Sequence, residues 1–230
     1  MTQRGQVLIF DADDTLWENN VIFEQVIDDY LDWLAHPTLD RAQLRAVLDD
    51  IERANSAAHG YGTRIFLRSL HDCVERLRER PATERERREI LGLADALINH
   101  RVELIPGVAE TLDELRGRHE LLMLTKGDTA EQQRKIDASG LAAHFQSVHI
   151  VREKHAGVYL RLVEEHGWKA AHTWMIGNSP KSDILPAREA GMNAVFIPNE
   201  VTWSLDNAEL DPGDDRVLHL SRFPELLDHF

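Results

Sequence analysis

The chain has 230 residues, 43% of them hydrophobic, which is enough for one large domain or for a domain with a sizeable insertion. Its formal net charge of -14 repels phosphate backbones and so disfavours general nucleic-acid binding, although a local group of cations can still bind a small anion. Cys73 is the only cysteine, which excludes an internal disulfide and a cysteine-rich zinc site.

The N-terminal stretch MTQRGQVLIF holds a short apolar run without the small-residue cleavage site of a signal peptide. No apolar stretch approaches the roughly 20 residues that are needed to cross a bilayer. We therefore expect a soluble protein of the reducing cytoplasm, with neither a membrane nor a nucleic acid as its partner.

An apolar run near the start of the chain is followed by a long helical segment. Val7–Phe10 is too short for a helix and is bounded by turn-forming residues, so we expect a buried strand. Apolar residues at helical spacing then predict four amphipathic helices, which together form a small bundle. In chain order, the first ends at His36-Pro37, the second runs from Asp40 to about Ala58, the third is closed by Pro81, and the fourth carries Ile90 to Ile98.

After Pro106-Gly107 the pattern changes to strands that alternate with helices. The expected strands cover residues 121–124, 148–151, 174–176, 194–197 and 217–220, and the expected helices cover residues 128–140, about 157–166, and a segment that opens with Ser179 and Pro180. This alternation predicts a parallel sheet with right-handed crossovers. The predicted fold is a Rossmann-like α/β core with helices on both faces, formed by residues 1–16 and 106–230, with residues 17–105 inserted as a helical domain.

Polar residues follow four of the expected strands. In chain order they are Asp11, Asp13 and Thr15 in VLIFDADDTLW, then Thr125 and Lys126, then Lys154, and finally the stretch GNSPKSD at residues 177–183. Because the carboxyl ends of parallel strands share one edge of the sheet, we expect these side chains to lie close together. Acids, a hydroxyl and an ammonium at one edge predict a site for a divalent cation and a phosphate.

These motifs resemble those of the haloacid dehalogenase superfamily, most closely those of its phosphatase branch. FDADDTLW is similar to the first motif of the superfamily, LLMLTKGD to the second, Lys154 to the third and IGNSPKSD to the fourth. The sequence IPGV at residues 105–108 is similar to the re-entry into the core after a helical cap of the family's first type. The resemblance covers nearly the whole chain and implies that the inserted helical segment is a cap domain.

The resemblance implies a covalent route for the hydrolysis of a phosphate ester. Asp11 would be the nucleophile that forms an aspartyl-phosphate, and Asp13 would protonate the leaving oxygen and then deprotonate the attacking water. Thr125 would donate a hydrogen bond to a phosphoryl oxygen, and Lys154 would pair with Asp11 and with the phosphate. Lys126 stands where the family more often has Asn, so its charge either aids phosphate binding or points to solvent, and we slightly favour solvent.

The same resemblance implies Mg²⁺ as the cofactor. Asp11 and the backbone carbonyl of Asp13 are the expected ligands, joined by Asp183 directly or through water. The fourth motif commonly begins Gly-Asp, whereas this chain has Gly177-Asn178. Asn178 therefore either offers the metal a neutral oxygen or is only a turn residue after the strand.

The predicted cap would close over the site and choose the substrate. Arg64 lies at the end of AHGYGTR, the most loop-like break between the expected cap helices. It would contact an anionic group of the substrate in one interpretation and form an ion pair within its own domain in the other, which we favour.

The leading hypothesis is a Mg²⁺-dependent phosphatase that acts on a small phosphorylated metabolite. A dehalogenase of the same superfamily attacks carbon without a metal and does not call for Asp13, so Asp13 and Asp183 argue against it. A phosphomutase shares the four motifs and differs in how well it excludes water. Two further alternatives are a phospho-receiver module, which is shorter and lacks the helical insertion, and a binding protein without turnover. The sequence leaves the identity of the substrate and the oligomeric state open.

Overall fold

The computed structural model describes residues 5–98 and 101–230 of the chain. The chain divides into two compact units, of which unit 1 comprises Met1–Asn19 and Val102–Phe230 and unit 2 comprises Asn20–Arg101. The sequence analysis expected the junctions after residue 16 and before residue 106. Each unit has a hydrophobic core of its own, so each can be understood by itself.

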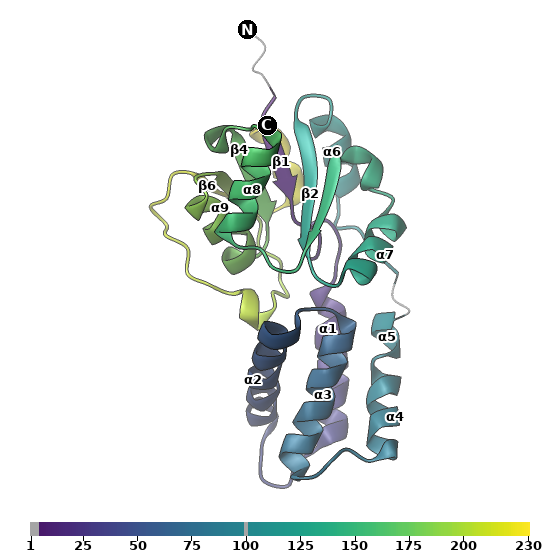
Figure 1. The fold of residues 1–230 in the computed structure, drawn as a ribbon. Helices are drawn as coiled ribbons and strands as arrows, with labels where there is room; N and C mark the ends of the chain where they lie inside the picture. Colours follow the sequence, from purple (N-terminus) through teal and green to yellow (C-terminus); the bar gives the residue numbers. More distant parts are fainter. Residues whose placement is uncertain (1–4, 99–100) are drawn as a thin grey trace. The chain divides into compact units, whose positions relative to one another are not determined.

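Unit 1 is built on a parallel sheet (Figure 1). Within the described residues the sheet has six strands in the order β3-β2-β1-β4-β5-β6, and all neighbouring pairs are parallel. The strands are β1 (Val7–Phe10), β2 (Glu120–Lys126), β3 (Ser147–Val151), β4 (Thr173–Gly177), β5 (Asn193–Phe196) and β6 (Val217–His219). The chain order reverses at β1, which pairs with both β2 and β4, and open α/β sheets bind their ligands at such a reversal.

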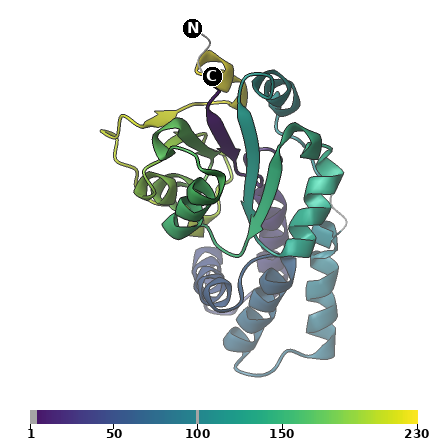
Figure 2. The same cartoon turned by 45° about the horizontal axis from the view of Figure 1, so that its top comes forward.

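Helices cover both faces of this sheet (Figure 2). Its α-helices in the described residues are α6 (Val108–Leu115), α7 (Thr129–Ser139), α8 (Ala156–His166) and α9 (Leu185–Glu189). Side chains alternate along a strand, so Leu8 and Phe10 of β1 pack in one cluster with α6 and α7, whereas Val7 and Ile9 pack in another with α8 and α9. The Rossmann-like α/β fold predicted from the sequence is thereby confirmed.

Two helix starts in unit 1 follow from local sequence. Asp128 caps α7, where its side chain accepts hydrogen bonds from the backbone N–H groups of Ala130 and Glu131, and Gly140 ends the helix in the left-handed conformation. Ser179 caps the short π-helix η3 (Pro180–Ile184), which begins with the expected proline and leads directly into α9. Both helix starts confirm the predictions made from these residues.

The sequence analysis missed α6, which follows Gly107. This glycine has a φ of 82° in the left-handed region, so the chain can turn sharply into the helix. Val108, Leu112 and Leu115 recur at helical spacing and are fully buried. The helix has only 8 residues, which leaves too little periodicity to distinguish it from a loop.

Unit 2 consists of helices that pack side by side (Figure 1). They are α1 (Asn20–Leu34), α2 (Arg41–His59), α3 (Thr63–Arg78), α4 (Glu84–Leu93) and α5 (Asp95–Ile98). The core contains Tyr30, whose hydroxyl donates to the carbonyl oxygen of Leu70 at 2.9 Å, and Leu48 from α2. The fourth expected helix is in fact two, because α4 ends at Leu93 and α5 begins at Asp95, with Ala94 between them.

The remaining short elements of unit 1 are the 3-10 helices η1 (Ala142–His144), η2 (Ala170–His172), η4 (Ser204–Asp206) and η5 (Phe223–Asp228). Phe223 and Leu226 of η5 complete the core beneath β1. In the described ranges, none of the helices combines the length and the apolar character that crossing a bilayer requires.

Candidate active site

The crowded acids after β1 have different surroundings. Asp14 adopts a left-handed φ of 59°, its N–H donates to the carbonyl of Trp17 at 2.7 Å, and its carboxylate accepts from the N–H of Asn19 at 2.9 Å. Asp14 therefore closes the turn, a position where Asp is tolerated in the left-handed region. Asp11 and Asp13, which flank Ala12, are therefore the candidate catalytic acids of this motif.

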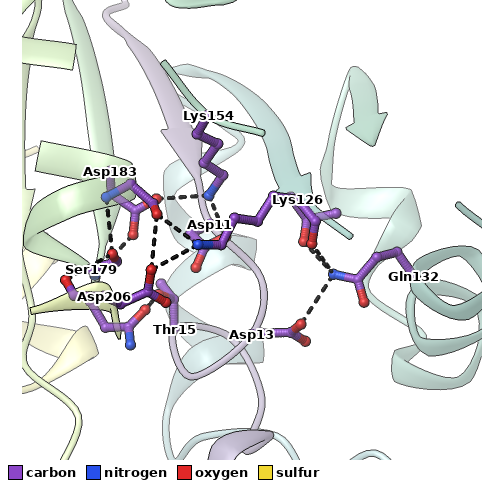
Figure 3. A network of polar contacts seen from close by, with 12 residues as sticks. Asp11, Asp13, Thr15, Lys126, Gln132, Lys154, Ser179, Asp183 and Asp206 are labelled. Carbon is purple, nitrogen blue, oxygen red and sulfur yellow. Dashed lines mark hydrogen bonds and ion pairs between the residues drawn. The ribbon is translucent and has the colours of Figure 1, made fainter. Parts of the chain in front are cut away.

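Asp11 shares one ammonium group with Asp183. Nζ of Lys154 donates to Oδ1 of Asp11 at 2.5 Å and to Oδ1 of Asp183 at 2.7 Å, as Figure 3 shows. The side chain of Lys154 is 1% exposed, that of Asp183 is 0% exposed and that of Asp11 is 11% exposed. Asp11 is thus the member of this trio that solvent, or a ligand, can reach.

The ionisation of this trio follows from burial and like charge. Burial, followed by the charge of Asp183, raises the pKa of Asp11 to about 7, although Lys154 acts in the opposite direction. Burial alone would lower the pKa of Lys154, but the carboxylates of Asp11 and Asp183 outweigh it, and the pKa of Lys154 lies above its usual value. Lys154 is therefore a cation, and Asp11 keeps its proton up to about pH 7 because Asp183 shares the same ammonium group.

The turn after β4 holds Asp183 in place. Its Oδ2 accepts from the N–H of Ser179 at 3.0 Å, four residues earlier in the chain. The carboxylate also lies against the backbone of Gly177, where an added Cβ would be 2.2 Å from Oδ2 of Asp183. Glycine at position 177 is therefore a steric requirement for this placement of the acid.

Asn178 lies beside the turn that follows β1. Its Oδ1 accepts a hydrogen bond from Oγ1 of Thr15 at 3.1 Å, and Asn178 and Thr15 are both buried. This bond joins the loop after β1 to the loop after β4, so Thr15 braces the turn. An amide oxygen with one such donor keeps a second lone pair.

Thr125, at the carboxyl end of β2, is connected to Asp13 through Gln132. Nε2 of Gln132 donates to Oγ1 of Thr125 at 2.5 Å and to Oδ2 of Asp13 at 3.1 Å. The contact to Asp13 is drawn in Figure 3. Gln132 is buried on α7 and was not singled out from the sequence, where a glutamine in a polar helix carries no distinctive signal.

Two further donors hold the carboxylate of Asp13. Nε1 of Trp17 donates to Oδ1 at 2.7 Å, and Nζ of Lys135 contacts Oδ1 at 2.7 Å and Oδ2 at 2.6 Å. Lys135 was also missed, although its spacing of three residues from Gln132 places both on one face of α7. That spacing, directly after the second motif, was the available signal.

Lys126 was expected by a small margin to point to solvent, and this expectation is wrong. Its Nζ donates to Oγ of Ser182 and to Oδ1 of Asp206, both at 2.7 Å, and it lies 5.8 Å from the ring centroid of Trp203. The side chain is only 15% exposed, and a buried ammonium needs such partners. Ser182 lies in η3 after β4, whereas Asp206 and Trp203 come from the connection after β5, which no sequence pattern placed near β2.

Arg64 belongs to unit 2. It lies in the first turn of α3 and is exposed. Its contact with a substrate stays a prediction.

The donors available for a cation are oxygens. Among the described residues, no three side chains of His, Cys, Asp and Glu form a group that could hold a metal ion. The set expected from the sequence is of another kind, since it combines the carboxylates of Asp11 and Asp183 with the amide of Asn178 and a backbone carbonyl at Asp13. Oxygen donors of this type, two of them carboxyl groups, fit the preferences of Mg²⁺.

Comparison with known proteins identifies the family. The model of the haloacid dehalogenase-like hydrolase family matches residues 6–191. The chain belongs to this family of hydrolases. The matched range contains every candidate residue at the carboxyl ends of the strands, from Asp11 to Asp183.

The similar proteins include a phosphatase, a hydrolase and a dehalogenase. A phosphoserine phosphatase of Thermus thermophilus is 26% identical, over 84% of this chain and 88% of the relative. A haloacid dehalogenase-like hydrolase from Xanthomonas campestris has 26% identity and a TM-score of 0.82, covering 99% of this chain and 96% of that one. The 2-haloacid dehalogenase from Pseudomonas syringae pv. tomato, with 20% identity, a TM-score of 0.59 and 97% coverage of both chains, shows the shared fold alone.

Proposed function

We propose that this hydrolase is a Mg²⁺-dependent phosphatase that cleaves a small phosphate monoester through an aspartyl-phosphate on Asp11. Membership of the family and the similarity to a phosphoserine phosphatase support this proposal. The observation that carries it is the second acid, Asp13, whose carboxylate is held by Trp17, Gln132 and Lys135. A departing alkoxide needs a proton, whereas a departing halide does not, so a positioned acid favours phosphate esters over haloacids.

In the first step, Asp11 attacks phosphorus. A bond forms between a carboxylate oxygen of Asp11 and phosphorus, and the bond from phosphorus to the ester oxygen breaks. Asp13, which enters this step in its protonated form, gives that oxygen its proton. Lys154 favours the ionised form of Asp11 and stabilises charge on the phosphoryl group. The hydroxyl of Thr125 donates to a phosphoryl oxygen.

In the second step, water replaces Asp11 on phosphorus. Asp13, now a carboxylate, takes a proton from the water as the water oxygen bonds to phosphorus. The bond between phosphorus and Asp11 breaks, and inorganic phosphate leaves. Each acid returns to its starting form, so the cycle balances.

Asp11, the backbone carbonyl of Asp13, Asn178 and Asp183 would hold the metal, with Asp183 acting directly or through water. Mg²⁺ supplies charge neutralisation of the clustered acids and of the phosphoryl oxygens. Unit 2 serves as the cap that selects a phosphorylated metabolite, with Arg64 as a candidate contact, and the enzyme acts in the cytoplasm.

The test is turnover of p-nitrophenyl phosphate with Mg²⁺ by the wild type and by Asp11→Asn. We expect multiple turnovers by the wild type and a loss of at least about a thousandfold in the variant, because the nucleophile is removed. A 2-haloacid assayed in parallel should give no product. Stoichiometric, long-lived phosphorylation would favour a receiver module instead, and no reaction would favour a binding protein.

A further inference from the structure

The carboxylate of Asp13 is contacted mainly from α7. Lys135 reaches both of its oxygens, and Gln132 reaches Oδ2. The side chain of Lys135 is 12% exposed, less than the 23% of Asp13 itself. Lys135 also donates to Oδ1 of Asn19 at 3.1 Å, on the far side of the same turn. The ammonium group of Lys135 is therefore largely buried and contacts two residues of the loop that carries Asp13.

The helix that carries these donors is firmly anchored. Its N-terminus is capped by Asp128 and its C-terminus is ended by Gly140. Ile136, next to Lys135, is 1% exposed in the core with β1 and β2 residues. Asp13, in contrast, lies in a loop, where its side chain would otherwise sample several rotamers.

Gln132 links this arrangement to the expected phosphate site. The same amide that contacts Asp13 donates to Thr125 at 2.5 Å and to the carbonyl of Lys126 at 3.1 Å. One face of α7 thus connects the acid to the end of β2. A catalytic acid needs its carboxyl group within about 0.5 Å of the productive position, and rotamers locked by neighbouring contacts provide this.

We propose that Lys135 is a positioning residue for Asp13: by contacting both carboxylate oxygens from α7, it fixes the place from which Asp13 serves the leaving oxygen and the attacking water. The proposal rests on the proposed phosphatase function. Lys135 itself touches neither substrate nor phosphorus. Its removal affects the steps in which Asp13 moves a proton and leaves the attack by Asp11 otherwise intact.

The test compares substrates that differ in their need for an acid. An alkyl phosphate releases a strongly basic alkoxide, whereas p-nitrophenyl phosphate releases a weakly basic phenolate. kcat/KM reports the first step, in which the leaving group departs. We expect Lys135→Met to lower kcat/KM for the alkyl phosphate at least about tenfold more than for p-nitrophenyl phosphate, since acid catalysis contributes roughly 10²–10⁴-fold.

A second readout does not depend on the leaving group. Hydrolysis of the aspartyl-phosphate also requires Asp13, so Lys135→Met should accumulate phosphoprotein during turnover of p-nitrophenyl phosphate, measured as intact mass after an acid quench. Lys135→Arg, which keeps the charge and the donors, should restore most of both properties. If Lys135→Met does not fold, judged by its thermal midpoint, Lys135→Gln takes its place.

Arg134→Met is the matched control, because it removes a neighbouring cation from the exposed side of the same helix. It should leave the ratio of the two kcat/KM values unchanged. Two results would overturn the role of Lys135: equal losses of kcat/KM on both substrates in Lys135→Met without accumulation of phosphoprotein, or the expected Lys135→Met pattern in Arg134→Met. The proposed function would still stand in either case if Asp11→Asn abolishes turnover. A wild type without turnover would overturn the proposed function and this inference together.

Discussion

Lys154 connects two acids that would otherwise repel each other. Asp11 and Asp183 each bind one side of its ammonium group, and both acids are buried. One cation cannot neutralise two carboxylates, and the pKa of Asp11 rises to about 7 because of burial and of Asp183. The pKa of Asp11, the proposed nucleophile, is thus set by its burial and by the charged residues around it.

This raised pKa predicts how stability changes with pH in the metal-free protein. The folded chain holds a proton on Asp11 up to about pH 7, whereas the unfolded chain loses it near the ordinary pKa of aspartate, 3.8. The contribution of Asp11 to the free energy of unfolding is therefore full below about pH 4 and is lost as the pH rises through about 7. At about 1.4 kcal/mol per pKa unit, the loss reaches at most about 4 kcal/mol.

Urea unfolding with EDTA at pH 4 and pH 8 measures this loss. The wild type should lose more stability over that interval than Asp11→Asn, which has no proton to release at this position. The same pH dependence in both proteins would show that Asp11 does not titrate in this range. Adding Mg²⁺ at pH 8 should stabilise the wild type more than the variant.

Gly177 gives a steric prediction at the same scale. A Cβ at this position would be 2.2 Å from Oδ2 of Asp183, so Gly177→Ala must displace the acid that contacts Lys154. A displacement of about 1 Å can cost about a hundredfold in rate, and we expect a loss of that order in kcat/KM for p-nitrophenyl phosphate. Gly92→Ala is the control, because nothing lies within 4 Å of its added Cβ. Unchanged activity in Gly177→Ala would contradict the requirement for this placement of Asp183.

At the scale of elements, the long connection between β5 and β6 has two charged attachments that can be compared. Near its middle, Asp206 accepts from Lys126 at 2.7 Å and from Oγ of Ser182 at 3.0 Å. Near its end, Asp214 forms a two-bond ion pair with Arg188, at 2.7 and 3.0 Å. In the first attachment Ser182 is next to Asp183 in sequence, whereas the second attachment is made to Arg188 of α9. Connections of this length usually carry function.

The two attachments predict different outcomes. Asp206→Asn should lower kcat/KM about tenfold or more, because it removes the counter-charge of a buried lysine beside the turn that holds Asp183. Hydrogen exchange should quicken over residues 198–207. Asp214→Asn should quicken exchange nearer to residue 214 and leave kcat/KM within about twofold. Similar kcat/KM values for the two variants would show that the contact between Asp206 and Lys126 does not affect catalysis.

Some secondary-structure elements were predictable from the sequence and others were not. Buried strands such as β1 and capped helices such as α7 are specified by local patterns, and these predictions are confirmed. The short helix α6 was missed because its apolar spacing covers few turns. The partners of Asp13 and Lys126 were missed for another reason: Lys135 is 122 residues from Asp13 and Asp206 is 80 from Lys126, so only tertiary packing brings them together.

At the scale of the molecule, a strongly acidic chain surrounds its candidate site with lysines. The net charge is -14, yet Lys126, Lys135 and Lys154 each lie largely buried in unit 1 at the carboxyl end of the sheet or on the helix beside it. Each is held by a carboxylate, so local attraction for a phosphoryl group is compatible with overall repulsion of polyanions. The strand-end acids that the sequence analysis grouped are joined by these cations.

The most direct test of the central claim is to find the phosphoryl group on the protein. Wild-type protein mixed with a phosphate ester and Mg²⁺, quenched in acid within its first turnover and digested, should carry phosphate on the peptide that contains Asp11, and the signal should disappear as turnover is completed. Asp11→Asn should show none. Turnover without any phosphorylated intermediate, or phosphate on a different residue, would contradict nucleophilic attack by Asp11.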